Sequence, residues 1–89
     1  MEKAAIIQVF GRVQGVGFRY YTEKKATELQ LRGFVENKAD GSVYIEAEGQ
    51  EENLEIFIAW CMKGPQWARV LNSTIQAAGP VGYTTFKIR

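Results

Sequence analysis

A glycine-rich stretch that ends in an arginine contains the residue types most suited to chemistry. Gly11, Gly15 and Gly17 lie between a β-prone run, residues 4–10, and a run with helical spacing that follows them. Small residues at such a turn let the backbone approach an anion, so that successive N–H groups and a helix N-terminus can converge on a phosphate group. Arg19 adds a permanently charged guanidinium that can bind two phosphate oxygens at once.

Two common phosphate-binding patterns do not fit this stretch. The P-loop has a second glycine followed by lysine, and Val16 stands at that place when Gly11 is taken as the first glycine. The dinucleotide pattern lacks its third glycine, because Tyr20 occupies that position. A turn that only connects a strand to a helix therefore stays an alternative. The position of Arg19 argues against it, since a cation at a helix start opposes the helix dipole and so favours an anionic ligand.

Composition limits the possible functions. The 89 residues are enough for one domain, residues 1–89, and a formal net charge of +1 provides no general attraction for nucleic acids or anionic membranes. Residues 1–20 show no signal peptide or membrane span, so we expect a cytoplasmic protein, acting as a monomer. Without any histidine, His-based nucleophile systems and His-containing zinc sites are excluded, and we expect no metal and no other cofactor.

Hydrophobic periodicity predicts two helices among five strands. The predicted helices are residues 19–31 and the segment from Glu51 to the Gly64-Pro65 pair, and the predicted strands are residues 4–10, 34–37, 43–48, 67–76 and 83–89. This order predicts an α+β, ferredoxin-like split βαβ sandwich, with two helices on one face of a mostly antiparallel sheet and a short additional C-terminal strand. In this layout Asn37 can come within reach of an anion held by residues 14–19.

Four residues carry local predictions. Gly33 is expected to end the first helix. Cys61 lies on the apolar stripe of the second helix and is expected to be a buried, unreactive thiol. Tyr20 and Tyr21 are expected to pack at the core and its rim rather than to contact a substrate.

Two long motifs are similar to those of a known family. Residues 11–19 (GRVQGVGFR) and 33–43 (GFVENKADGSV) closely resemble the two signature segments of the acylphosphatases. The match continues through residues 47–49 and 64–65 to the C-terminal residues 86–89, and so covers essentially the whole chain. Phe34 replaces the tryptophan expected as the commonest residue at its position.

The resemblance implies a small, stand-alone acylphosphatase, which hydrolyses the carboxyl–phosphate bond of acyl phosphates to a carboxylate and inorganic phosphate. By matching positions, Asn37 orients the attacking water, and a phosphate-binding loop holds the phosphoryl group, the loop being Gln14, Gly15, Val16, Gly17, Phe18 and Arg19. Inorganic phosphate is then both product and competitive inhibitor. Because an acyl phosphate carries a good leaving group, positioning and charge stabilisation suffice without a protein nucleophile or a metal.

Each assignment has an alternative. Arg19 can form a surface ion pair with a glutamate, and Asn37 can cap the hairpin turn that follows it. The segment Arg32-Gly33-Phe34 faintly resembles an element of RNA-binding domains, in which a sheet stacks single-stranded bases. A carbamoyl-phosphate-handling module of a larger maturation protein is a further possibility.

Overall fold

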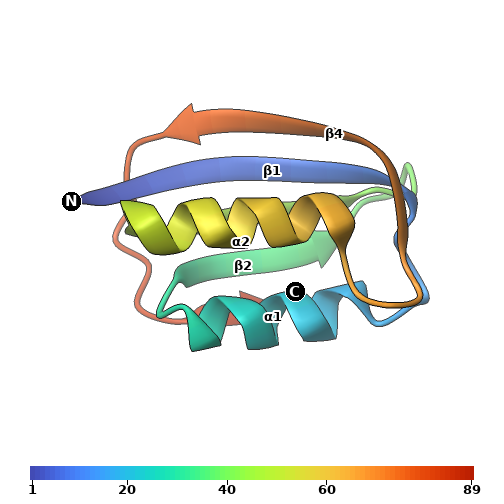
Figure 1. Cartoon of the computed structure of the whole chain (residues 1–89), viewed down its shortest axis with the longest axis horizontal. Helices are drawn as coiled ribbons and strands as arrows, with labels where there is room; N and C mark the ends of the chain where they lie inside the picture. The colour runs from blue at the N-terminus through green and yellow to red at the C-terminus, as the bar shows by residue number, and fades with distance from the viewer.

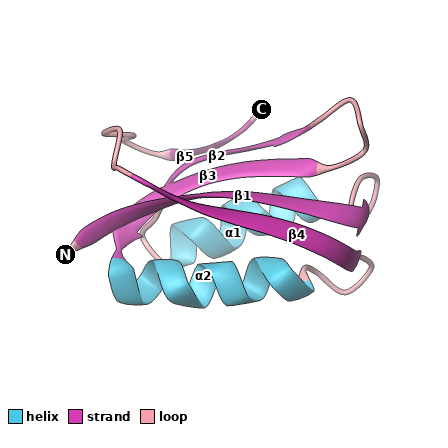
Figure 2. Cartoon of the chain, turned by 90° about the horizontal axis from the view of Figure 1, so that it is seen from above, coloured by secondary structure: helices cyan, strands magenta, loops and turns pink.

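Two helices cover one face of a five-stranded sheet (Figure 1, Figure 2). The computed structural model describes all 89 residues. In chain order the elements are β1 (Glu2–Arg12), α1 (Phe18–Glu28), β2 (Arg32–Asn37), β3 (Val43–Gln50), α2 (Glu51–Lys63), β4 (Arg69–Ala78) and β5 (Phe86–Ile88). The sheet order is β4-β1-β3-β2-β5, and only the β2–β5 pair is parallel. The predicted fold class is confirmed.

The core lies between the helices and the sheet, because strand residues alternate between two faces. On β1, Ile7 and Val9 are fully buried, and Ile45 of β3 lies beside Ile7 in the same layer. Phe57 of α2 is also fully buried and closes this layer from the helical side. β1 is an inner strand that lies between β3 and β4, and both of its faces carry apolar residues: Ile7 and Val9 on one, Ile6 and Phe10 on the other.

Gly33 does not end the first helix, so that prediction is wrong. α1 ends at Glu28, and Gln30 turns the chain with a φ of 59°. The N–H of Leu31 then donates to the carbonyl of Ala26 at 2.9 Å, which closes the turn. Gly33 lies inside β2, where a Cβ atom would stand 1.8 Å from the carbonyl oxygen of Glu46. Glycine is required there because β2 and β3 approach each other so closely.

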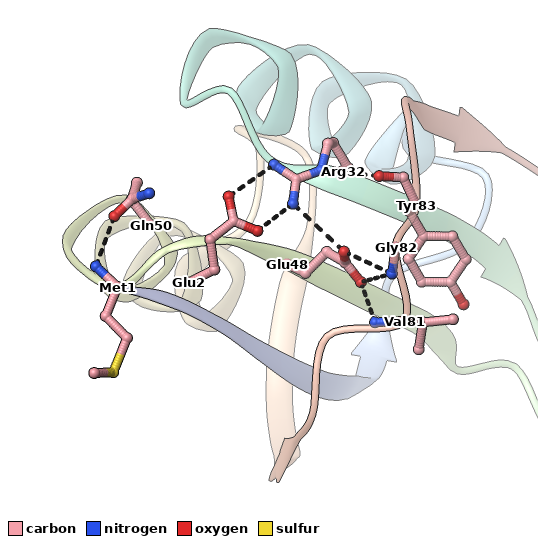
Figure 3. Close-up of polar contacts among 8 residues, drawn as sticks. All are labelled: Met1, Glu2, Arg32, Glu48, Gln50, Val81, Gly82 and Tyr83. Carbon is pink, nitrogen blue, oxygen red and sulfur yellow. Dashed lines mark hydrogen bonds and ion pairs between the residues drawn. The ribbon is translucent and has the colours of Figure 1, made fainter.

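The last strand is also shorter than residues 83–89, since β5 begins at Phe86 and the carbonyl of Tyr83 is bonded to a side chain and not to a neighbouring strand. The N–H groups of Val81 and Gly82 donate to the Glu48 carboxylate instead of joining the sheet. Arg32 donates through Nε to the carbonyl of Tyr83 at 2.9 Å and also reaches Glu48 (Figure 3). These bonds hold the chain across the sheet before β5 begins.

Two further observations concern the helices. Cys61 is fully buried in the core, as expected, and burial raises the pKa of its thiol. Neither helix is long and apolar enough to cross a membrane.

Candidate active site

The loop between β1 and α1 lies at the end of the sheet where β2 also ends. Val13 fixes the start of the loop in the core, with only 1% of its surface exposed. Gly15 and Gly17 have φ angles of 75° and 80°, in the left-handed region that glycine adopts without strain. Gly17 is the N-cap of α1, and no side chain caps this helix. The glycine-rich pattern therefore reflects backbone conformation at both positions.

The backbone N–H groups of residues 14–20 donate to no acceptor of the chain. The first bond of this region is donated by Tyr21, to the carbonyl of Gly17 at 3.1 Å. The first turn of α1 also contains no acidic residue. Free N–H groups at a helix N-terminus are the usual backbone binding site for an anion.

Arg19 projects from the first turn of α1 and pairs with no aspartate or glutamate. Its Nη1 donates to the main-chain oxygen of Arg89 at 3.0 Å, just after β5. No Asp or Glu carboxylate lies within 4.0 Å of the guanidinium, since the ion pairs that these carboxylates form involve other cations. The alternative of a surface ion pair with a glutamate is therefore wrong for Arg19.

Asn37 is the last residue of β2, and its side chain is exposed. Its amide makes no hydrogen bond within the chain. The hairpin turn is capped instead by Asp40, whose Oδ1 accepts from the N–H and the hydroxyl of Ser42 at 2.9 and 2.6 Å. These bonds lower the pKa of the Asp40 carboxyl, chiefly through the hydroxyl. The turn-capping alternative for Asn37 is therefore wrong.

Gln14 connects the loop to this hairpin. Its Nε2 donates to the carbonyls of Lys38 and Ser42 at 2.8 and 2.9 Å. Because Lys38 follows Asn37 directly, these two bonds fix the end of β2 against the glycine-rich loop. The sequence motif contained Gln14 but gave no indication of this side-chain role.

A cleft of about 230 Å³ brings most of the predicted site together. Its lining residues are Val13, Gly15, Gly17, Phe18, Arg19, Tyr20, Asn37 and Ile88. Gln14 and Val16 belong to the loop but do not line the cleft. Arg19 is the only charged residue of the lining, so the cleft is electrostatically suited to an anion.

Three lining residues were missed by the sequence interpretation: the buried Val13, and Tyr20 and Ile88. Tyr20 was expected to pack at the core or its rim, but 57% of its surface is exposed and it lines the cleft. Ile88 comes from β5, and 44% of its surface is exposed. No local pattern marks Ile88, because its place beside α1 depends on the parallel pairing of β5 with β2.

The open face of the sheet does not favour base stacking. Phe34 is only 5% exposed, because the guanidinium of Arg89 lies over its ring and Tyr83 packs against its edge. The hydroxyls of Tyr44 and Tyr83 both donate to the carboxylate of Glu46, which raises the pKa of Tyr44 to about 12. An acidic group between the aromatic rings would repel a nucleic-acid backbone.

Comparisons with known proteins agree with this fold. The family model for acylphosphatases matches residues 5–88. An acylphosphatase from Thermotoga petrophila is 47% identical over 87 residues, which cover 98% of this chain and 97% of that protein. The solved structure of an acylphosphatase from Coxiella burnetii superposes with a TM-score of 0.94 at 38% identity, covering 99% of this chain and 93% of that one. This α+β domain belongs to the acylphosphatase family.

The same domain also occurs inside a larger protein. The chain superposes on a structure of full-length HypF in a phosphate- and nucleotide-bound form, with a TM-score of 0.88 and 32% identity. The superposition covers 100% of this chain but only 12% of the HypF chain. The module of a larger protein therefore remains an alternative to the stand-alone enzyme.

Proposed function

We propose that this chain hydrolyses acyl phosphates by holding the phosphoryl group in the glycine-rich loop and placing a water molecule with Asn37, without a metal. The observation that carries the proposal is that Arg19, Asn37 and the loop glycines line one cleft. Family membership supports the reaction, and the geometry supports the roles of the individual residues.

The phosphoryl oxygens bind to the backbone N–H groups of residues 14–18 and to the guanidinium of Arg19. The N–H groups are available because none of them donates within the chain. Arg19 is available because its one bond within the chain uses only Nη1, so that most of its donors can serve a ligand. Charge on the phosphoryl group is stabilised most when such donors are already in place.

Asn37 orients the attacking water from the opposite side of the cleft. Its amide is free of other bonds, and the Gln14 bonds to the hairpin hold the backbone beside it. The water oxygen forms a bond to phosphorus, and the bond between phosphorus and the acyl oxygen breaks. The acyl oxygen leaves with its electron pair as carboxylate, and the proton of the water goes to a phosphoryl oxygen of the substrate.

No residue of the cleft is suited to acid or base catalysis. The lining contains no carboxylate, and the sequence contains no histidine. No group of three or more His, Cys, Asp or Glu side chains is placed to hold a metal ion. The mechanism therefore depends on positioning and charge stabilisation, which a reactive mixed anhydride permits. The cytoplasmic location and the monomeric state stay predictions.

The test is hydrolysis of benzoyl phosphate by the purified chain, with p-nitrophenyl phosphate as a monoester control. We expect turnover of benzoyl phosphate alone, competitive inhibition by inorganic phosphate, and no change after exhaustive chelation. A chelation-sensitive rate that magnesium or zinc restores would contradict the metal-free mechanism. Failure to hydrolyse any acyl phosphate would contradict the proposed activity.

A further inference from the structure

The cleft has an apolar side that the phosphoryl group does not use. Four of its eight lining residues are hydrophobic: Val13, Phe18, Tyr20 and Ile88. Val13 and Phe18 are each only 1% exposed, so a ligand hardly reaches them. The apolar surface that a ligand can contact is therefore formed by Tyr20 and Ile88, at 57% and 44% exposure.

These two residues flank the phosphate-binding arginine from different segments of the chain. Tyr20 follows Arg19 directly on α1. Ile88 precedes Arg89, whose carbonyl accepts the hydrogen bond from Arg19 at 3.0 Å. Both residues line the same cleft as Arg19, although 68 positions separate them in the sequence.

The ring of Tyr20 also has a fixed neighbour. It packs edge-on against the ring of Tyr21, with centroids 5.0 Å apart. The Tyr21 ring in turn lies over Gly17, where an added Cβ would stand 3.4 Å from it. Tyr20 therefore packs on a ring that itself contacts the N-cap of α1.

We propose that Tyr20 and Ile88 form the surface that contacts the acyl group of the substrate and that they favour aromatic over small acyl groups. This inference rests on the proposed function. The acyl group is bonded to the phosphoryl group, so it must lie next to Arg19 when the phosphate is bound. The other exposed lining residues, Gly15, Gly17 and Asn37, offer no large apolar side chain for the acyl group. The lining also offers no second charge that would select an ionic acyl group.

The test compares benzoyl phosphate with acetyl phosphate in Tyr20→Ala and Ile88→Ala. We expect the ratio of kcat/KM for benzoyl phosphate to that for acetyl phosphate to fall by about threefold to tenfold in each variant, because apolar contact area is lost. The inhibition constant of inorganic phosphate should change less than twofold, since phosphate has no acyl group. Two independent variants keep the test decisive if one of them folds poorly.

Two control variants separate ring contact from other effects. Tyr20→Phe keeps the ring and should keep the ratio. Ile56→Ala truncates an apolar residue on the outer face of α2 that is 52% exposed and does not line the cleft, so it should also keep the ratio. An unchanged ratio in Tyr20→Ala and Ile88→Ala, with both substrates still hydrolysed, would overturn the inference but not the proposed function. Failure of the unmodified chain to hydrolyse either substrate would overturn both.

Discussion

Two arginines at opposite ends of the sheet have contrasting partners. Arg32, at the start of β2, donates to both carboxylate oxygens of Glu2, to the buried Glu48 and to the carbonyl of Tyr83 (Figure 3). Arg19, beyond the opposite end of β1, donates once, to the main-chain oxygen of Arg89, and has no Asp or Glu carboxylate within 4.0 Å. Both side chains are partly exposed.

The difference shows which arginine serves the fold and which serves a ligand. A guanidinium has five N–H donors, and it contributes to stability when acceptors of the chain take them. Arg32 meets that description, and its contacts join β1, β2, β3 and the segment before β5. Arg19 leaves most of its donors free, next to N–H groups that are also free. Its charge is therefore available to a bound anion.

The largest effect that tests this comparison is expected for Arg19→Ala. Because the phosphoryl group loses its only cationic partner in the cleft, kcat/KM for benzoyl phosphate should fall by about 10³-fold or more. Inhibition by inorganic phosphate should be lost in parallel, while the melting midpoint should change little. Steady-state kinetics, phosphate titration and thermal melting measure the three quantities.

Arg32→Ala provides the matched control for this loss, since it removes the same side chain from the other end of the sheet. Arg19→Lys sharpens the result. One ammonium group cannot replace a planar guanidinium that binds two oxygens at once, so this variant should be little more active than Arg19→Ala. Nearly full activity in Arg19→Lys would show that only the charge matters. Unchanged phosphate inhibition in Arg19→Ala would show that the anion does not bind at this end of the molecule.

The next largest effect is expected for Asn37→Ala, which shares the cleft with Arg19 but has a different proposed task. If Asn37 orients water, kcat should fall by about 10²–10³-fold, while phosphate should bind nearly as before. Since Asn37 makes no side-chain bond within the chain, the variant should also melt near the unmodified protein. A parallel loss of phosphate affinity in a folded variant would contradict the water-positioning role.

A smaller effect of another kind is expected for Arg32→Ala. The buried Glu48 loses a charged partner but keeps the N–H groups of Val81 and Gly82, so the free energy of unfolding should fall by about 1–3 kcal/mol. The turnover of the molecules that remain folded should stay within about twofold of the original. Denaturant unfolding and kinetics at saturating substrate measure these outcomes.

Arg69→Ala is the stability control, because Arg69 is exposed and forms no ion pair. It should leave the unfolding free energy within about 0.5 kcal/mol of the original. A loss as large as that of Arg32→Ala would show that the charge network has no special role in stability.

Much of this arrangement could be predicted from the sequence, because it depends on local periodicity. The alternation in residues 4–10 and the apolar stripe of α2 gave the strands, the helices and the central place of β1. The glycines before Arg19 indicated the turn that exposes N–H groups. The sequence did not show that the Asn37 side chain lacks a partner within the chain, since asparagine near a turn more often bonds the backbone. Only the structure shows that Asp40 caps this turn.

The rest could not be predicted, because it depends on contacts between distant segments. Gly33 has the pattern of a helix stop, yet it is needed where β2 approaches Glu46 of β3. Tyr83 has the pattern of a strand residue, yet its carbonyl accepts a hydrogen bond from Arg32 and not from a neighbouring strand. Neither feature is visible until the register of the sheet is known.

The smallest expected effect is a pH dependence of stability that arises from Glu2, a partner of Arg32. The hydrogen bonds from Arg32 hold the pKa of Glu2 below its usual value of 4.5. A carboxyl whose pKa is lower in the folded state stabilises the fold above its unfolded pKa, and this contribution disappears as the pH falls through the folded value. The effect is small because Glu2 is exposed to solvent and its ion pair is screened. Glu2→Gln should therefore lower the melting midpoint slightly at pH 7 and converge with the unmodified protein below pH 4.

The comparison of the two ends gives this last prediction its control. Asp40, in the hairpin next to the cleft, also has a lowered pKa, chiefly because the Ser42 hydroxyl donates to it. The contribution of Asp40 to stability should persist in Glu2→Gln. The melting midpoint of this variant should therefore still fall with decreasing pH, although less than in the unmodified protein. Turnover at pH 7 should be unchanged, because Glu2 lies at the end of β1 away from Arg19. If the melting midpoints of Glu2→Gln and of the unmodified protein differed by the same amount at every pH down to pH 3, Glu2 would act by packing and not by its charge.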